Sequence, residues 1–357
     1  MKVMAINSSP RSGSGESKTE LMLNSLLEGM RQAGAEVELV NLREKRVRYC
    51  AGCFTCWTKT PGKCIHKDDM TGALFPQWLE SDLVIYATPL YHFHVNAHMK
   101  TFIERTLPML EPFLIEGENG ATRHPLRHKV PAVVMLSVAG FPEMHVFDQL
   151  SAWTRFIFRD SLKAEIYRPA AELMSTPLGE KKGFEILQAT EQAGRELVEN
   201  GEIANQTMQA ITQPMGDKKD IATMANMFWR TCIAQGITPK EASEQDLLPR
   251  PESLEEMVLL LPMGFQSESA GDLEAVLQYD FSGSIEGSCH FNIANGLMTG
   301  DVGPATDPTL TIAVDFDLWL DVMAGRENGQ EIFMQGKAKA SGDLGLLMRF
   351  SQLFGKS

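Results

Sequence analysis

Four of the six cysteines in this 357-residue chain lie within one short stretch. They have the spacing C-x2-C-x2-C-x7-C and are Cys50, Cys53, Cys56 and Cys64. Three thiolates two residues apart can converge on one polynuclear centre, because a compact loop turns each sulfur inward while its amides donate to the sulfides. The fourth thiolate can close the site from the turn at Pro61-Gly62. The spacing therefore favours an iron–sulfur site.

Two other uses of these cysteines stay open, namely a zinc site and bare thiols. A zinc site of four cysteines more often uses two separated C-x2-C pairs. Disulfides are disfavoured because we expect a cytoplasmic protein, where thiols stay reduced. The remaining cysteines, Cys232 and Cys289, fall in a helical stretch and on the inward face of an alternating strand, so we expect both to be buried as small apolar residues.

A second candidate site follows the first predicted strand, Lys2 to Ile6. Residues 7–19 form a hydroxyl-rich loop that leads into a helix, where backbone N–H groups and the positive helix end suit a phosphate. Neither the dinucleotide G-x-G-x-x-G nor the Walker pattern is present. The plainer alternative is a capping box, in which Ser17 and Glu20 exchange hydrogen bonds.

Strands alternate with helices through the first part of the chain, which predicts right-handed crossovers and a doubly wound parallel sheet. The predicted strands are 2–6, 36–42, 83–87, 131–137 and 164–168, and the predicted helices are 17–33, 69–80, 96–105, 144–158 and 184–200. In such a sheet, ligands bind at the carboxyl ends of the strands. The loops after those strands must therefore position the chemistry.

The pattern changes near residue 249, where paired prolines resist both helix and strand. We predict domains at 1–248 and 254–357. Beyond the prolines, strand signals dominate, with a tight hairpin turn at Asn295-Gly296 and helices at 254–262, 316–323 and 343–353. This segregation predicts an α+β domain.

Charge limits the partners. The net charge is −13, and after residue 254 there are 15 acidic against 5 basic residues, a balance of −10. This acidity disfavours nucleic acid and anionic membranes. The sequence has no signal-peptide pattern and no apolar run long enough to span a bilayer, so we expect a cytoplasmic protein with no membrane span.

Two motifs of the first section resemble flavodoxin-like NAD(P)H-dependent FMN reductases. Ser9-Pro10-Arg11 followed by Ser17-Lys18-Thr19 is similar to the phosphate loop of that family, and residues 87–105 are similar to its T-P-x-Y loop and following helix. The resemblance implies the α/β, flavodoxin-like, doubly wound parallel sheet with strand order 2-1-3-4-5. It also implies that FMN is bound. The phosphate residues would be Ser9, Arg11, Ser17, Lys18 and Thr19, and the ring residues Pro89, Leu90, Tyr91, His92 and Phe93.

A proline-bounded loop with Tyr and Phe also makes physical sense for a flavin. The isoalloxazine is a large flat ring that needs apolar cover and backbone N–H groups near its reactive edge. Gly140, after the fourth predicted strand, permits close backbone approach at the same edge and joins the candidates. His92, His94 and His98 form an alternative metal group, although only His94 and His98 have the spacing of one helix face.

Within this superfamily, iron–sulfur flavoproteins carry a compact run of cysteines at the same place, after the second strand. The match implies a [4Fe–4S] cluster held by the four clustered cysteines. The x7 gap is longer than the shortest versions of the run, and related reductases keep part of the pattern without a cluster.

The C-terminal section, from about Leu254 to Phe354, resembles the sterol carrier protein type 2 domain. That family forms a five-stranded sheet backed by helices around an apolar tunnel for sterols, fatty acids or acyl-CoA. The candidates for the tunnel lining are Met323, Met334, Met348, Phe350, Leu353 and Phe354, any of which could equally be ordinary core.

These resemblances together predict an FMN-dependent NAD(P)H oxidoreductase or electron-transfer iron–sulfur flavoprotein fused to a lipid-binding module. The expected partners are a small-molecule or protein electron donor and acceptor, an apolar ligand and further copies of the chain in a homo-oligomer. No catalytic acid or base is predicted, because the flavin carries the chemistry. The alternative is a lipid-binding carrier whose flavodoxin-like half is structural or redox-sensing.

Overall fold

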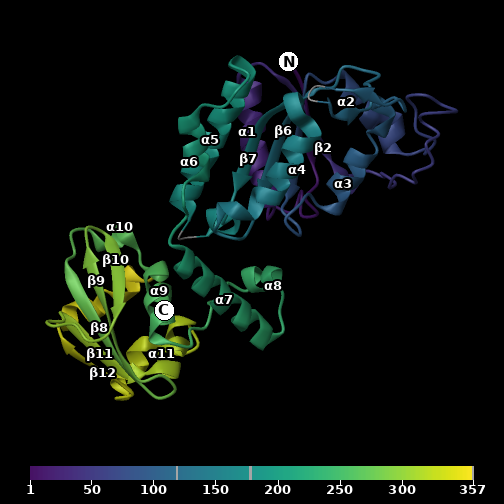
Figure 1. The fold of residues 1–357 in the computed structure, drawn as a ribbon. Coiled ribbons are helices and arrows are strands. Elements are labelled where there is room, and N and C mark those ends of the chain that lie inside the picture. Colours follow the sequence, from purple (N-terminus) through teal and green to yellow (C-terminus); the bar gives the residue numbers. More distant parts are fainter. Residues whose placement is uncertain (118–119, 177–178, 356–357) are drawn as a thin grey trace. The chain divides into compact units, whose positions relative to one another are not determined.

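The computed structural model of the protein describes residues 1–117, 120–176 and 179–355. The chain divides into two compact units, Met1–Met215 and Gly216–Ser357 (Figure 1). The domain boundary predicted between 248 and 254 lies further along the chain and stays a prediction. Helices α7 (Lys218–Gln235) and α8 (Pro239–Glu244) lie between the two positions.

The first unit is built on a five-stranded parallel sheet. Its strands are β1 (Lys2–Asn7), β2 (Glu36–Asn41), β3 (Leu83–Pro89), β6 (Ala132–Val138) and β7 (Leu162–Arg168). They lie in the order β2-β1-β3-β6-β7. The predicted flavodoxin-like order 2-1-3-4-5 is therefore confirmed.

Burial explains why these segments form strands. Every residue of β3 is buried, as a central strand with both faces covered requires. In β2, exposed and partly buried residues alternate over the first four positions, as expected for a strand at the edge of the sheet.

Helices cover both faces of this sheet. On one face lie α1 (Lys18–Gln32), α5 (Glu180–Glu199) and α6 (Asn205–Thr212). On the other lie α2 (Phe75–Glu80), α3 (Ala97–Glu104) and α4 (Asp148–Phe158). Each set packs its apolar residues against one alternating face of the strands (Figure 1). The crossovers predicted from the sequence thus form a doubly wound layer structure.

Several predicted helices begin as tighter or wider turns. The helix predicted at 69–80 starts with the π-helical turn η2 (Met70–Leu74), and the one predicted at 144–158 starts with the 3-10 turn η5 (Met144–Phe147). Short elements elsewhere in this unit are η1 (Leu42–Glu44), η3 (Leu107–Met109), η6 (Arg159–Ser161), η7 (Ala171–Ser175), β4 (Ile115–Glu116) and β5 (Thr122–Arg123).

The second unit has a five-stranded mixed sheet in the order β10-β9-β8-β11-β12. The strands are β8 (Ala275–Ser282), β9 (Gly287–Ala294), β10 (Leu297–Val302), β11 (Leu310–Asp315) and β12 (Ala338–Gly342). The helices are α9 (Leu254–Leu260), η8 (Leu261–Gly264), α10 (Ser267–Ala270), α11 (Phe316–Met323), α12 (Gly329–Met334), α13 (Leu344–Met348) and α14 (Phe350–Leu353). Within the described part of this sheet, β8 and β11 pair in parallel and the other neighbouring strands pair antiparallel. The α+β class predicted for this unit is therefore confirmed.

The predicted hairpin turn in this unit is present. Asn295 and Gly296 join β9 to β10 with φ of 53° and 71°, the left-handed pair that a two-residue hairpin favours. The single helix predicted at 343–353 is instead two short helices, α13 and α14, that meet at Arg349. Cys232 and Cys289 are both buried, as predicted.

Among the residues that the structure describes, no helix is long and apolar enough to cross a membrane.

Candidate functional site

The loop between β1 and α1 gathers several hydroxyl groups at the carboxyl edge of the first sheet. Ser9, Ser17 and Thr19 are buried there. The Ser17 and Ser9 hydroxyls lie 2.8 Å apart, and the backbone N–H of Arg11 donates to the Ser9 Oγ at 3.2 Å. The predicted phosphate residues Ser9, Ser17 and Thr19 are therefore brought together at the start of α1.

Ser12 adds a group that the sequence analysis did not single out. Its side chain is 1% exposed, and its Oγ has no hydrogen-bond partner among the described residues. The first N–H groups of α1 also lack intrahelical acceptors by their position. A buried hydroxyl and free amides at one helix end fit an anionic ligand with several oxygens.

The capping alternative is only half realised. Ser17 Oγ accepts from the Glu20 N–H at 3.1 Å, but the Glu20 carboxylate accepts from the N–H of Gly13 at 2.8 Å rather than from Ser17. Glu20 thus holds the loop in shape. Ser17 caps the helix, and its hydroxyl also faces Ser9 inside the loop.

The two predicted cationic residues of this loop lie differently. Arg11 is exposed and pairs with Glu172, which follows β7, at 2.8 Å. That hydrogen bond, opposed by partial burial and aided by the charge of Glu172, raises the pKa of Arg11. Lys18 is partly exposed at the first position of α1. The loop therefore has two cations at its rim.

The loop after β3 makes a tight turn against the first loop. Tyr91 and His94 pair through two backbone hydrogen bonds of 3.0 Å, and the residues between them, His92 and Phe93, have φ of 47° and 60°. Behind the turn, Asn96 donates from Nδ2 to the Ser8 carbonyl at 2.6 Å. The first and third strand ends are thereby tied together.

Aromatic rings stand exposed at this edge. Tyr91, Phe93 and Phe141 are 46%, 47% and 55% exposed, and the rings of Phe93 and Phe141 stack with centroids 5.9 Å apart. Phe141 directly follows Gly140, where a Cβ would lie 4.0 Å from the Glu172 side chain. Exposed aromatic surface beside polar loops is typical of a binding site.

The other predicted ring residues support the turn from behind. Pro89 is buried at the end of β3, and the N–H of Leu90 donates to the Val138 carbonyl at 2.9 Å. Ser137, at the end of β6, is fully buried, and its Oγ has no partner within the described residues. The donor set and the aromatic surface fit FMN, with the phosphate at α1 and the ring at the aromatic turn. The individual residue assignments stay predictions.

Sequence reasoning missed Ser12, Ser137, Phe141 and Glu172 at this edge. The signal available for Phe141 was its position directly after Gly140. No local pattern marks Glu172, because its part in the site depends on the pairing of β7 beside β6. The alternative of a metal site at His92, His94 and His98 receives no support, since the His94 ring packs edge-on against Trp153 with ring centroids 4.5 Å apart. Burial, with Lys100 nearby, lowers the pKa of His94.

The second candidate site is the cysteine loop. Cys50, Cys53, Cys56 and Cys64 line one cavity of about 20 Å³, together with His66 and Arg105. Cys56 is buried, and that burial, followed by the negative charges of Cys64, Cys50 and Cys53, raises its pKa. The charges of the other three cysteines therefore all act on Cys56.

Turn hydrogen bonds hold the loop compact. The Gly62 N–H donates to the Cys56 carbonyl at 2.9 Å, and the Thr60 hydroxyl donates to the Lys63 carbonyl at 2.7 Å. The Thr55 hydroxyl contacts the Cys53 Sγ at 3.4 Å, a hydrogen bond that lowers the pKa of Cys53. Gly62 has φ of 79°, which the predicted turn at Pro61-Gly62 requires of it.

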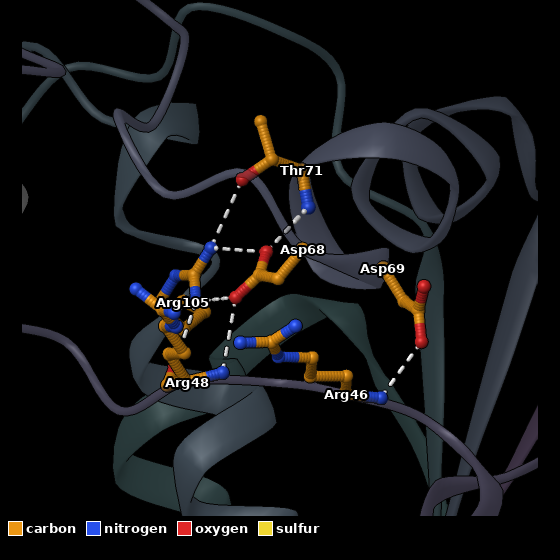
Figure 2. Close-up of polar contacts among 6 residues, drawn as sticks. All are labelled: Arg46, Arg48, Asp68, Asp69, Thr71 and Arg105. Atoms are coloured by element: carbon orange, nitrogen blue, oxygen red, sulfur yellow. Dashed lines mark hydrogen bonds and ion pairs between the residues drawn. The ribbon is translucent and has the colours of Figure 1, made fainter.

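A buried ion pair fixes the base of this loop (Figure 2). Arg105, directly after α3, binds the Asp68 carboxylate through both terminal nitrogens, at 2.7 and 3.0 Å, and the two side chains are 1% and 0% exposed. Asp68 also accepts from the N–H groups of Arg48 and Thr71, at 3.0 and 3.2 Å. Burial alone would raise the pKa of Asp68, but these hydrogen bonds outweigh it and hold the pKa well below its usual range.

Arg105 makes further contacts to the same segments. It donates to the Arg48 carbonyl at 2.6 Å and to the Thr71 hydroxyl at 3.0 Å. The residue after Asp68, Asp69, accepts from the Arg46 N–H at 2.7 Å (Figure 2). The pair therefore joins the segment that leads into the cysteine loop, the π-helical turn η2 and the end of α3.

The donor set suits an iron–sulfur cluster, because four thiols and a buried cation share one cavity. Among the described residues, no group of three or more His, Cys, Asp or Glu side chains is arranged to hold a single metal ion. With a volume near that of one water molecule, the cavity would have to open when a cluster binds. All six cysteines are free of disulfides.

In the second unit, the lining candidates separate into two groups. Leu353 is buried in the core, and Met323, Phe350 and Phe354 pack against it. Met334 and Met348 are exposed, so neither is part of the core. The side chains of these two methionines therefore contact solvent and are not enclosed by the domain.

Comparison with known proteins supports the family resemblance predicted for each of the two sections of the chain. Residues 1–162 match the family described as NADPH-dependent FMN reductase, and residues 266–355 match the SCP-2 sterol transfer family. The chain thus combines an FMN reductase-type section with an SCP-2-type section, and the resemblance of both sections is confirmed.

Among curated proteins, an iron-sulfur flavoprotein of Archaeoglobus fulgidus is 41% identical over 122 residues, which cover 34% of this chain and 53% of that protein. An iron-sulfur flavoprotein of Methanocaldococcus jannaschii is 34% identical over 122 residues, covering 34% of this chain and 59% of that protein. The chain spans little more than half the length of these relatives. Among solved structures, the NAD(P)H:quinone oxidoreductase from Methanothermobacter marburgensis has a TM-score of 0.43 at 16% identity, covering 55% of this chain and 96% of that one.

Proposed function

We propose that this protein is an FMN-dependent oxidoreductase that takes electrons from NAD(P)H or a reduced electron carrier and passes them on through an iron–sulfur site. The match to the FMN reductase family supports FMN as the cofactor and an oxidoreductase as the class of protein. The electron donor and acceptor, the cluster and the homo-oligomer all belong to the proposal, as does a location in the cytoplasm.

The observation that carries the proposal is the convergence of two complementary features at one sheet edge. The buried, unpartnered hydroxyl of Ser12 lies in a loop at a helix N-terminus, and the exposed rings of Tyr91, Phe93 and Phe141 belong to the neighbouring strand ends. The first suits a phosphate and the second a large flat ring.

FMN, when bound, would accept a hydride from nicotinamide and release electrons one at a time. The residues of this chain would bind and orient it. Ser9, Ser12 and Ser17 would hold the phosphate, and the turn at Tyr91 to Phe93 would cover the ring and keep water from it. Gly140 would let the backbone after β6 approach the ring closely.

In the cysteine loop, Cys50, Cys53, Cys56 and Cys64 would hold a [4Fe–4S] cluster, which supplies one-electron transfer when present. The names of the curated relatives support this assignment, as does the shared cavity of the four thiols. If the cysteines instead hold zinc or remain bare thiols, anaerobically purified protein would contain neither iron nor sulfide.

Anaerobic purification tests both cofactors at once. We expect about one FMN per chain, iron and sulfide near four per chain, and bleaching of the flavin absorbance on addition of NAD(P)H or a reduced carrier. Protein that neither retains FMN nor binds it after supplementation, as followed by quenching of flavin fluorescence, would refute the proposal. Iron-free protein that still binds FMN would leave the flavin assignment intact and remove the cluster.

A second candidate function is that of a lipid-binding carrier, which the SCP-2 family match favours. We propose that the second unit binds an apolar ligand. Its core contains two buried polar atoms, Tyr279 Oη and Trp319 Nε1, that lack partners among the described residues, and a ligand with one polar group could satisfy them. Displacement of a fluorescent fatty acid by sterols and acyl chains tests this, and a colourless protein that extracts lipid would favour the carrier over the enzyme.

A further inference from the structure

The cysteine cavity contains a cation that its ligand pattern does not require. Arg105 lines the cavity beside the four thiols, and its side chain is 1% exposed. A buried guanidinium is costly unless its charge and all its N–H groups are satisfied. The partners of each nitrogen therefore indicate what Arg105 does there.

Asp68 satisfies only part of the hydrogen-bonding capacity of the Arg105 guanidinium. The two terminal nitrogens bind Asp68, the Arg48 carbonyl and the Thr71 hydroxyl. Nε is buried and has no hydrogen-bond partner among the described residues. A buried donor left without an acceptor destabilises the fold, and a ligand that brings an acceptor to this cavity would remove that cost.

Cys64 lines the same cavity as Arg105, so its sulfur is a candidate acceptor for this donor. Burial alone would lower the pKa of Arg105, but the hydrogen bonds to Asp68 and then the negative charge of Cys64 outweigh it and raise the pKa. Cys64 is the one thiol of the cavity whose charge contributes to that shift. The bidentate contact with Asp68 prevents the guanidinium from turning away.

His66 contributes to the same cavity a second buried nitrogen that has no hydrogen-bond partner among the described residues. Its Nε2 is buried, lacks a partner within the described part of the chain, and belongs to a residue that lines the same cavity. Whether His66 Nε2 would donate or accept depends on its tautomer, whereas Arg105 Nε can only donate. Only Arg105 carries its proton under all ordinary conditions, so the inference depends on Arg105.

We propose that Arg105 is a positioning residue of the cysteine site, whose Nε–H donates to the Cys64 sulfur and whose charge raises the reduction potential of a bound [4Fe–4S] cluster. This rests on the proposed function, in which the four cysteines hold that cluster. One-electron reduction adds a negative charge, and a fixed cation nearby favours the state that carries it. Asp68 holds the guanidinium at the sulfur.

The test uses full-length, anaerobically purified protein with three substitutions. Arg105→Gln removes the charge, and Arg105→Lys keeps a cation without the fork that matches the carboxylate. Arg168→Gln is the matched control, because Arg168 is also buried with an unpartnered Nε but does not line the cysteine cavity; within the described residues it donates to the Ile211 and Gln213 carbonyls, both at 2.8 Å. Iron and sulfide content and the midpoint potential, followed by EPR in a redox titration, are measured for each.

We expect Arg105→Gln to lower the equilibrium constant for one-electron reduction at least tenfold, which is about 59 mV. Arg105→Lys should show a smaller fall, and Arg168→Gln none. Unchanged potential in cluster-containing Arg105→Gln would overturn the proposal while leaving the proposed function standing. Wild-type protein without iron and sulfide would instead overturn the proposed function itself.

Loss of the cluster from Arg105→Gln would still leave a decisive measurement on the wild type. Protein labelled with ¹⁵N at the arginine Nε is reduced, and pulsed EPR is used to look for a weak nitrogen coupling to the cluster. A coupling is expected, and its disappearance in Arg105→Lys would assign it to this residue. A reduced cluster with no such coupling would refute the hydrogen bond.

Discussion

Buried polar atoms without partners mark both candidate sites of the first unit. Ser12 Oγ and Ser137 Oγ lie at the sheet edge, and Arg105 Nε and His66 Nε2 lie at the cysteine cavity; none of the four has a partner among the described residues. Buried donors and acceptors are nearly always satisfied in folded proteins. Thr154 Oγ1 and Arg168 Nε and Nη2 also lack partners within the described residues, so an unpartnered atom supports a ligand site only where other features of that site accompany it.

Ser12 gives the sharpest single-residue test of the FMN site. Ser12→Ala should weaken FMN binding about tenfold or more, because a hydrogen bond to a charged phosphate contributes about 1.5–3 kcal/mol. The dissociation constant is measured by quenching of flavin fluorescence. Ser14→Ala is the control, since the exposed Ser14 hydroxyl donates to the Arg11 carbonyl within the loop. Equal affinities for the two variants would place the phosphate elsewhere.

Asp68 predicts how the cysteine loop responds to acid. Its folded-state pKa lies below the unfolded value of about 3.9, so its contribution to stability is present above that pH and is lost as the pH falls below it. We expect the difference in urea midpoint between wild type and Asp68→Asn to be largest near about pH 6 and to shrink toward about pH 3. A difference independent of pH would mean that the Asp68 charge does not stabilise the fold.

At the scale of elements, close contact between α1 and α5 determines how one face of the sheet is covered. A Cβ on Gly29 would lie 1.8 Å from the Glu191 carbonyl oxygen, and one on Gly194 would lie 2.0 Å from the Leu26 carbonyl oxygen. The two helix backbones can approach this closely only because each has a glycine at the contact. The position of α1 matters to the proposed FMN site, since the candidate phosphate loop leads into its N-terminus.

Gly194→Ala should therefore destabilise the first unit by about 1–3 kcal/mol, the range expected for overpacking. The urea midpoint followed by circular dichroism measures it, and a weaker FMN affinity should accompany the loss. Gly72→Ala is the control within the same unit, because a Cβ there meets no atom within 4 Å. If Gly194→Ala were as stable as the control, the two helices would have to be further apart than described.

At the scale of the whole molecule, the chain consists of a unit suited to redox chemistry and a unit suited to apolar ligands, and the point of division is itself testable. Helix α7 is bound to the segment that leads into α9, because Arg230 pairs with Glu252 and Glu256 at 3.1 and 2.5 Å. The Arg250 N–H donates to the Thr231 hydroxyl at 2.8 Å. These contacts place α7 with the residues that follow it.

A fragment of residues 216–357 should accordingly be more stable than one of residues 254–357, by about 2 kcal/mol or more, because the shorter fragment loses the buried Met227 and the Arg230 pairs. Thermal unfolding of the two fragments measures the difference. Equal stability would favour the boundary between 248 and 254 that the prolines predict.

The strand order followed from the resemblance to flavodoxin-like FMN reductases. The fold classes and the regions of both candidate sites could be predicted from the amino-acid sequence. These depend on local signals that persist in the structure: buried strand runs, the Ser17 cap, the Asn295-Gly296 turn and the cysteine spacing. Such signals act over a few residues, so they can be recognised without knowing the packing. The cofactor and domain families followed from motifs of the same short range.

The distant residues that complete each site became visible only in the folded chain. Glu172 meets Arg11 across 161 positions of sequence, and Arg105 reaches Asp68 across 37. The exposure of Met334 and the break at Arg349 likewise depend on how helices pack rather than on their local pattern. Long-range pairs leave no periodic mark in the sequence, because their geometry arises only when the sheet brings the strand ends and loops together.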